Sequence, residues 1–567
     1  METFVPPSWD RFRDWIHCVA VVTFDLELGQ TLELIYPPHM KLSESEKTNI
    51  CYLSFPDSNS GCMGDTQFHF RIRYTPTKLD LAATKQFYLS YNVKCPPPLQ
   101  VSHKFLNGYV YFRQVKDPTL RRGYFQKSVV ILSLFPFLNL FNQMLDVLAP
   151  EFFDSGPKAI ENACTDIYRW PPPTPGQTLS IKFLNTQIQI SVPSQNSLRT
   201  DSPTSSTAPT TFENENKTMM ANPHLGLPNV VIPSIFQPDL FLCLRPVLSH
   251  LHLFWELILT AEPIVVMAPL PDMCANTVYA LQSMIFPLKF CADFRPYFTI
   301  HDTDFKEYTL KSSAPPPVVL GVTNPFFAKT LQHWPHIIRM GDPSAVQNGK
   351  LKKANNIKLL DSQPGVYTSY RPFLQKDKNL IKKILLGMQS QRPGEVQTII
   401  LRKHLRELTE SFMIPLERYL ASLMPLQKNI CPCKAAPLPR PFNPDEFLAT
   451  LETSGPHLTT GIKGEWGSLY KKFFRSINFS EWYNVRYKEA AEKLQALHLE
   501  ILSDSDVKSW ISGRDEVEAV DLVLRLREQI AQSNLPIKPD VRDKLQVHVD
   551  AILKTLPDDL RSVLQAN

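Results

Sequence analysis

The sequence predicts a multidomain protein with an α+β part, an α/β part and an all-α part. Three observations support this fold class. Apolar residues alternate with polar ones in the first third of the chain, continuous apolar runs alternate with helical spacing in the middle, and helical spacing dominates the end. The length of 567 residues also exceeds what one hydrophobic core usually serves.

Residues 10–190 predict an antiparallel sheet with helices packed on it. Apolar and polar residues alternate from Val22 to Leu28, and the alternation resumes after the turn residue Gly29, which indicates a hairpin. Further strands are expected at Thr66–Tyr74, Tyr109–Val115 and Ser128–Phe135, followed by helices that begin at Pro136 and near Lys158.

Residues 191–227 predict a disordered linker. The segment is rich in Ser, Thr, Pro and Asn and nearly free of large apolar side chains. It therefore cannot bury enough apolar surface to offset the conformational entropy lost on ordering.

Residues 228–365 predict an α/β sandwich with a mostly parallel sheet. A helix is expected over Pro238–Leu259, with a kink at Pro246. The short apolar runs Pro263–Ala268 and Pro316–Val322 are typical of strands buried on both faces. Another helix is expected to begin at Pro325.

The remainder of the chain predicts helices, in a downstream part at 366–475 and a C-terminal extension at 476–567. Two long helices are expected first, with apolar faces that consist of Leu401, Leu405, Leu408 and Phe412 in one and of Ala490, Leu494, Leu497 and Ile501 in the other. A third long helix is expected to begin at Val517.

Composition narrows the classes of function. The 60 basic and 55 acidic residues nearly cancel, which is too small an excess for a dedicated nucleic-acid-binding protein. The ten cysteines are scattered without a CxxC pair, and no signal peptide is recognised, so a cytoplasmic protein with reduced thiols is expected. The most membrane-like stretch, from Ser128, contains several polar residues, so no transmembrane segment is expected.

The sequence shows no phosphate-binding loop, nucleophile elbow or zinc-binding helix motif. His301, Asp302 and Asp304 are metal-ligand types, but one cluster cannot fill a coordination shell, so we expect a polar loop and keep a metal site as the alternative. We predict no catalytic residue, no cofactor and no metal. The short basic segments around Arg121, Lys350–Lys353 and Lys376–Lys383 indicate solvated surface, or else a surface for an acidic protein or an anionic membrane.

Three segments of the middle block resemble the DENN family. The helix ending in Glu262 before Ile264-Val265-Val266, the helix closed by Phe286-Pro287, and the lead Ala314-Pro315 into a strand ending at Gly321 match its signatures. The segments "CVAVVTFDLELGQTLELIYP", "GDTQFHFRIR" and "GYVYFRQVKD" resemble its branch of DENN-domain-containing protein six and Avl-nine proteins.

This resemblance implies a longin-like first lobe, an α/β DENN lobe, and a guanine-nucleotide exchange factor for a Rab small GTPase. The GTPase would be bound across two lobes that flank it, and the protein would be recruited from the cytoplasm to recycling or early endosomes by peripheral association. Two alternative functions stay open: a tether that binds a Rab, and an activator of GTP hydrolysis that inserts an arginine. The candidate partner-binding residues are Asp25, Glu27, Arg113, Arg121, Arg122, Asp293, Arg295, Tyr297 and Asp302, with Arg113, Arg121 and Arg122 as the candidate inserted arginines.

Overall fold

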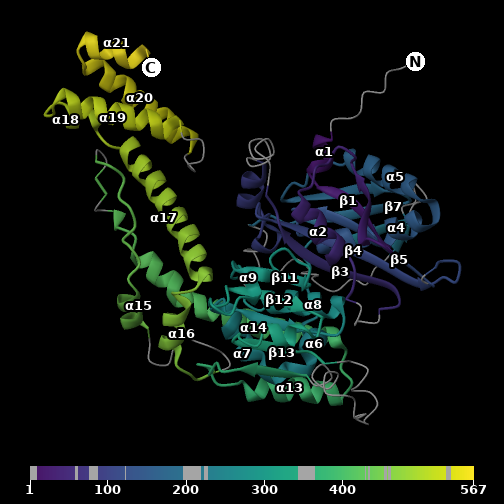
Figure 1. Cartoon of the computed structure of the whole chain (residues 1–567). Helices are drawn as coiled ribbons and strands as arrows, with labels where there is room; N and C mark the ends of the chain where they lie inside the picture. Colours follow the sequence, from purple (N-terminus) through teal and green to yellow (C-terminus); the bar gives the residue numbers. More distant parts are fainter. Residues whose placement is uncertain are drawn as a thin grey trace, which may run out of the picture. The chain divides into compact units, whose positions relative to one another are not determined.

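The chain forms two compact units, Met1–Glu407 and Leu408–Asn567 (Figure 1). The boundary falls inside a long helix, within the helical part predicted at 366–475. The computed structural model describes residues 9–57, 62–75, 87–121, 123–195, 219–221, 228–341, 364–427, 430–431, 434–451, 456, 461–531 and 538–566.

The first lobe of the first unit is built on a five-stranded antiparallel sheet, as predicted. Its strands are β1 (Cys18–Asp25), β2 (Gly29–Tyr36), β3 (Gly64–Arg73), β4 (Phe105–Lys116) and β5 (Tyr124–Ser133), in the order β2-β1-β5-β4-β3. Alternate residues enter two different cores: Tyr109 and Ile131 face one, and Val110 and Val130 face the other. The central strands are thus buried on both faces, which holds the sheet firmly.

Helices cover both faces of this sheet. α4 (Leu138–Ser155) and α5 (Pro157–Tyr168) contribute to one core, while α2 (Glu44–Leu53) contributes to the other. The predicted start of α4 at Pro136 was two residues early, because Phe137 has a non-helical backbone and its ring stacks on Phe135. α2 was not predicted, although Ser43 and Glu46 form the capping box that its sequence spacing allows.

A second, four-stranded sheet extends the first core. It contains β6 (Gln177–Phe183), β7 (Thr186–Val192), β9 (Pro228–Pro233) and β8 (Met219–Ala221), in the order β6-β7-β9-β8. The β6–β7 hairpin was missed, although its apolar residues alternate clearly. Most of the predicted linker 191–227 lies outside the described residues, but its residues 219–221 form β8.

The second lobe has the predicted mostly parallel sheet. Its strands β10 (Ile264–Met267), β11 (Asp293–Phe298), β12 (Val318–Val322), β13 (His336–Arg339) and β14 (Gly365–Thr368) lie in the order β11-β12-β10-β13-β14. Only the β13–β14 pairing among them is antiparallel.

The described helices of the second lobe lie in the predicted segments, although the helix predicted to begin at Pro325 is short. The first helical stretch is broken into α6 (Leu240–Leu244), the 3-10 turn η3 (Arg245–His250) and α7 (Leu251–Leu259), which confirms the kink at Pro246. The short α10 (Phe327–Thr330) begins two residues after Pro325. Helices α8 (Pro271–Ser283) and α9 (Phe305–Thr309) also belong to the described part of this lobe.

Among the described residues, one stretch is long and apolar enough to span a membrane, Leu240–Leu259, and 72% of its apolar window is buried inside the protein. Such burial is typical of a core helix. The stretch from Ser128 that seemed most membrane-like in sequence forms part of β5 and α4 instead.

α13 (Lys378–Gln389) and the long α14 (Gly394–Ser422) lead out of the second lobe. The predicted apolar face of α14, from Leu401 to Phe412, is buried as expected. The second unit continues with α15 (Pro444–Thr450), α16 (Trp466–Phe473), α17 (Ile477–Ser503), α18 (Val507–Ile511), α19 (Glu516–Ala531), α20 (Pro539–Thr555) and α21 (Asp558–Ala566).

The predicted apolar face of α17 was partly wrong. Leu494 is buried, but Leu497 and Ile501 are only half-buried, and the residues in the core are Leu499 and Leu502. The contact surface is therefore rotated by about two residues along the helix, because α18, α19 and α20 pack on that side.

Candidate functional site

Two turns lie at one end of the five-stranded sheet of the first lobe. Asp25 closes the β1–β2 turn opposite Gly29, and Lys116 pairs with Tyr124 across the β4–β5 turn. Because Thr23 of β1 pairs with Lys127 of β5, both turns project from the same end of the sheet. We call residues 25–29, 115–121 and 123–124 together the hairpin end.

Hydrogen bonds within the β1–β2 turn hold its shape. The Asp25 carboxylate accepts from the backbone N–H groups of Glu27, at 2.8 Å, and Leu28, at 2.9 Å. These backbone donors, that of Leu28 foremost, lower the pKa of Asp25, because they stabilise its charged form. The predicted partner-binding residues Asp25 and Glu27 are both exposed here.

The β4–β5 turn is held in a similar way. The Asp117 carboxylate accepts from the Thr119 hydroxyl at 2.6 Å and from its backbone N–H at 2.9 Å. Gly123 has a positive φ of 72°, which glycine adopts without strain. Arg121 is exposed in this turn, while Arg122 lies outside the described residues.

Large apolar side chains are exposed on the hairpin end. Leu28 is 75% exposed and Leu26 is 54% exposed in the first turn. Val115, Leu120 and Tyr124 are each about 40% exposed at the second turn. Apolar side chains gathered among charged ones are typical of a protein interaction surface. None of these apolar residues was predicted from the sequence to bind a partner, although leucines inside a charged turn are a signal that could have indicated it.

Arg113, by contrast, is held on the surface of the sheet. Its guanidinium makes two 2.7 Å hydrogen bonds to the carboxylate of Asp65 and lies 4.6 Å from the ring centre of Phe153. The hydroxyl of Tyr111 donates to the same carboxylate at 2.7 Å. Arg113 thus stabilises the β3–β4 pair and lowers the pKa of Asp65, mainly through its hydrogen bonds.

The other predicted residues lie in the seam where β3 of the first lobe packs against β11 of the second. Arg295 is fully buried and bonds to Asp293 at 2.9 Å, to Asp304 at 2.8 Å and to the carbonyl oxygen of Arg71 at 3.0 Å. Tyr297 is also fully buried among the apolar residues of the first lobe. Their side chains hold the lobes together and offer no surface to a partner.

The loop after β11 completes the seam. Asn49 of α2 exchanges two hydrogen bonds with Thr303, at 2.9 and 3.0 Å, and Tyr52 stacks on His301 with ring centres 4.2 Å apart. Arg73 forms a bidentate pair with Glu307, at 2.7 and 2.9 Å. The lobes are therefore in direct contact, and a partner that contacts both must lie beside this seam and not between β3 and β11.

The predicted metal-ligand cluster belongs to this loop. Asp302 is buried, and one of its carboxylate oxygens accepts from the backbone N–H of Asp304 at 2.8 Å. Burial raises the pKa of Asp302 to about 6. Within the part of the chain that the structure describes, no three His, Cys, Asp or Glu side chains gather as a metal site would need. The loop serves the contact between lobes.

The eight predicted residues that the structure describes lie in two separate places. Asp25, Glu27 and Arg121 lie at the hairpin end with Arg113 next to it on the sheet, and the seam holds Asp293, Arg295, Tyr297 and Asp302. Arg113 is linked to Asp65 near the start of β3, and Asp293 is linked to Arg71 near its end. Asp65 and Arg71 are six residues apart on β3, so at about 3.3 Å per residue the two places are roughly 20 Å apart. Of the two groups, only the hairpin end is exposed, so it is the candidate interaction site.

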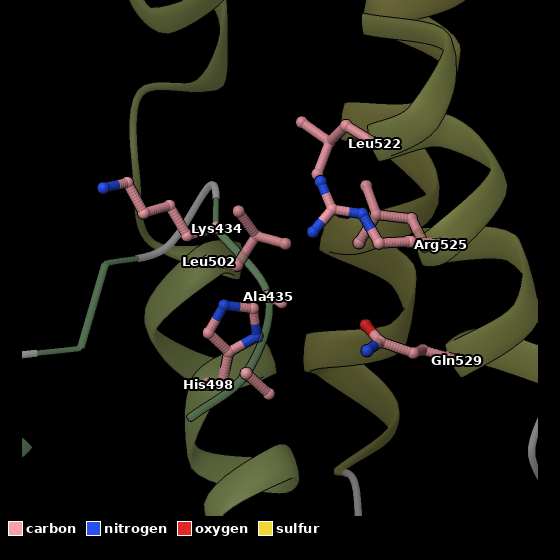
Figure 2. A pocket seen from close by; sticks show the side chains of 9 residues that line it. Lys434, Ala435, His498, Leu502, Leu522, Arg525 and Gln529 are labelled. Atoms are coloured by element: carbon pink, nitrogen blue, oxygen red, sulfur yellow. The ribbon is translucent and has the colours of Figure 1, made fainter. Parts of the chain in front are cut away.

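A small pocket in the second unit is not a candidate site (Figure 2). It lies between α17 and α19 and is lined by His498, Leu502, Leu522 and Arg525, among others. Its free volume of about 10 Å³ admits at most about one water molecule. A substrate or cofactor of ordinary size does not fit.

Comparisons with known proteins agree with the architecture. The DENN (AEX-3) domain model matches residues 124–338, the model of the transport protein Avl9 matches 16–162, and that of the DENND6 C-terminal domain matches 507–567. Together these three matches cover parts of both units.

Whole-length relatives carry DENND6 names. The chain is 50% identical to Protein DENND6A of Mus musculus over 563 residues, which cover 98% of this chain and 91% of that protein. It is 49% identical to Protein DENND6B of Homo sapiens, with 98% and 94% covered, and 32% identical to the DENND6 homolog of Dictyostelium discoideum, with 95% and 80% covered. The chain therefore belongs to the DENN family and, within it, to the DENND6 group.

Proposed function

We propose that this protein is a guanine-nucleotide exchange factor that binds a Rab small GTPase through the hairpin end and promotes release of GDP. The observation that supports it most is the exposure of Leu26 and Leu28 on a turn whose shape is fixed by Asp25. Membership of the DENN family supports the choice of a small GTPase as the partner.

Exchange requires no acid, base or nucleophile in the factor. The factor binds the nucleotide-free GTPase more tightly than the loaded one, so factor and nucleotide weaken each other's binding by the same ratio. A nucleotide held near picomolar affinity is bound by about −16 kcal/mol, so the competing interface must be broad, about 1,200–2,000 Å² in total.

Rigidity is the property that this mechanism needs from the factor. A soft surface would adapt to the loaded GTPase and lose the difference in affinity on which exchange depends. The hairpin end extends from a sheet with central strands buried on both faces. The buried seam further fixes that sheet to the second lobe within one compact unit.

We further propose that the protein acts at recycling or early endosomes, with a Rab that resides there. The test is a panel of purified Rabs loaded with fluorescent GDP, mixed with catalytic amounts of the full-length protein. Faster GDP release from one Rab or a few of them is the expected result. Binding of GTP-loaded Rab with no change in release from any member would instead identify a tether.

Activation of GTP hydrolysis is the second candidate function, and the exposure of Arg121 in the β4–β5 turn is what favours it. An inserted arginine can stabilise the charge that develops during phosphoryl transfer. Arg113 fits this role less well because Asp65 holds its guanidinium. Phosphate release that rises with wild-type protein and falls to the intrinsic rate with Arg121→Ala would establish this function over exchange.

A further inference from the structure

Helix α13 has a fixed inner face. Leu380, Ile384 and Gly387 are buried. The side-chain amide of Gln397 in α14 donates to the carbonyl oxygen of Ile384 at 3.1 Å, and an added Cβ at Gly387 would lie 2.3 Å from that amide. The close approach of the two helices at Gly387 determines which side of α13 faces outward.

The outer face of α13 combines lysines with leucines. Lys378, Lys382 and Lys383 are exposed, and Leu385 and Leu386 are 48% and 52% exposed. Lys382 is three and four residues from the two leucines, so all three share one side of the helix (Figure 1 labels α13). We call these five residues the α13 outer face.

No acidic residue neutralises these lysines from within the helix, since α13 itself contains none. Asp377, which precedes it, turns inward as the N-cap and accepts from the backbone N–H groups of Asn379 and Leu380. Its side chain is only 8% exposed and lies 4.0 Å from Nδ1 of His404. Lys376 and Arg371, just before the helix, are exposed and extend the positive charge.

We propose that the α13 outer face docks this protein on an anionic membrane surface. Such a surface attracts each nearby lysine, and the apolar region beneath the headgroups accepts leucine side chains. Long lysine side chains can reach the headgroups while their stems cover the leucines. An acidic protein would satisfy the lysines, but acidic groups alone would leave the two adjacent leucines in water, so the membrane fits the whole face better.

The test measures co-sedimentation of the full-length protein with vesicles of phosphatidylcholine, with or without phosphatidylserine. Wild-type protein is expected to bind only the vesicles that contain phosphatidylserine, and more weakly at high salt. Each lysine near the surface contributes about fivefold in affinity, so Lys382→Glu with Lys383→Glu is expected to lower binding by about 25-fold or more. Leu385→Ser with Leu386→Ser is expected to lower it as well, with the charge unchanged.

The matched control is Lys158→Glu with Lys182→Glu, which makes the same charge change at exposed lysines of the first lobe. It is expected to retain most of the binding. The proposal would be overturned by any of three results. These are equal losses of binding in the control and test variants, no binding of vesicles by the wild type, and binding to a soluble acidic peptide but not to vesicles.

This inference adds to the proposed function and does not depend on nucleotide exchange, so the two can fail separately. GDP release from a soluble Rab without vesicles is expected to be the same for wild type and the α13 lysine variant. Thermal unfolding of each variant verifies that its folding is intact.

Discussion

Arg71 of the first lobe and Asp293 of the second form a 2.7 Å ion pair in the seam between the lobes. The Arg71 guanidinium also lies against two rings, 3.8 Å from the centre of Phe105 and 4.2 Å from that of Phe294. Asp293 in addition holds the buried Arg295. One carboxylate therefore serves two arginines, and the seam depends on it.

Asp293→Asn is expected to destabilise the first unit by about 3 kcal/mol, because it leaves two largely buried guanidinium groups without their shared carboxylate. Thermal unfolding should show a clear fall in the midpoint. Glu44→Gln removes an exposed ion pair with Lys47 and should cost less than about 1 kcal/mol. Equal effects of the two substitutions would show that the seam pair contributes no more than a surface pair.

Gly321→Ala is expected to destabilise the second lobe by about 3 kcal/mol or more. The added Cβ would lie 2.2 Å from the backbone oxygen of Pro296 and 2.8 Å from Sγ of Cys274, so the β11–β12 pair would have to shift. Gly467→Ala is the control, since its Cβ would meet nothing closer than 3.9 Å and helix α16 should gain about 0.5–1 kcal/mol. Thermal unfolding measures both, and a neutral Gly321→Ala would contradict this account.

Asp302→Asn is expected to change how stability depends on pH. Burial raises the pKa of Asp302 from 3.8 to about 6, so the folded protein holds this proton more tightly than the unfolded chain. The contribution of Asp302 is therefore most favourable below about pH 4 and is lost as the pH rises through about 6. The full loss is on the order of 2–3 kcal/mol.

Since asparagine does not titrate, the unfolding free energy of the variant minus that of the wild type should rise between pH 4 and pH 7 by that amount. Urea unfolding at several pH values gives this difference. A difference that does not change with pH would show that Asp302 titrates normally.

Leu26→Ser with Leu28→Ser is expected to slow GDP release from the responsive Rab by at least about tenfold, because full burial of a leucine side chain gains about 1.5–3 kcal/mol and the interface would lose two of them. The thermal midpoint should stay nearly unchanged, since both side chains are already exposed. Leu438→Ser removes a leucine of similar exposure, 67%, in the second unit and should not affect release. Wild-type rates in the double variant would place the Rab site elsewhere.

Strands and long helices could be predicted because their residues repeat with the period of the element. The β1–β2 hairpin was predictable in this way. The buried strands β10 and β12 were predictable from continuous apolar runs, and the kink from Pro246 itself. The helix α2 and the β6–β7 hairpin had equally local signals, the Ser43 capping box and the alternation of β6, but neither element was predicted.

The candidate site was only half predictable. Asp25, Glu27 and Arg121 could be placed at turns, and the register of β1 with β5 brings those turns to one end of the sheet. Arg295 and Tyr297 were predicted as partner-binding residues on the same grounds, their polar or aromatic side chains, yet both are fully buried. The difference depends on β3 packing against β11, which joins residues more than two hundred positions apart.

The sequence by itself determined the elements and their order, because backbone periodicity, turns and helix ends are set by neighbours along the chain. Its segments also carried the likeness to the DENN family. Only the tertiary structure decided which charged residues are buried in the seam and which are exposed, because that follows from contacts between distant segments. The outward side of α13 was decided in the same way, by the close approach of Gly387 to Gln397.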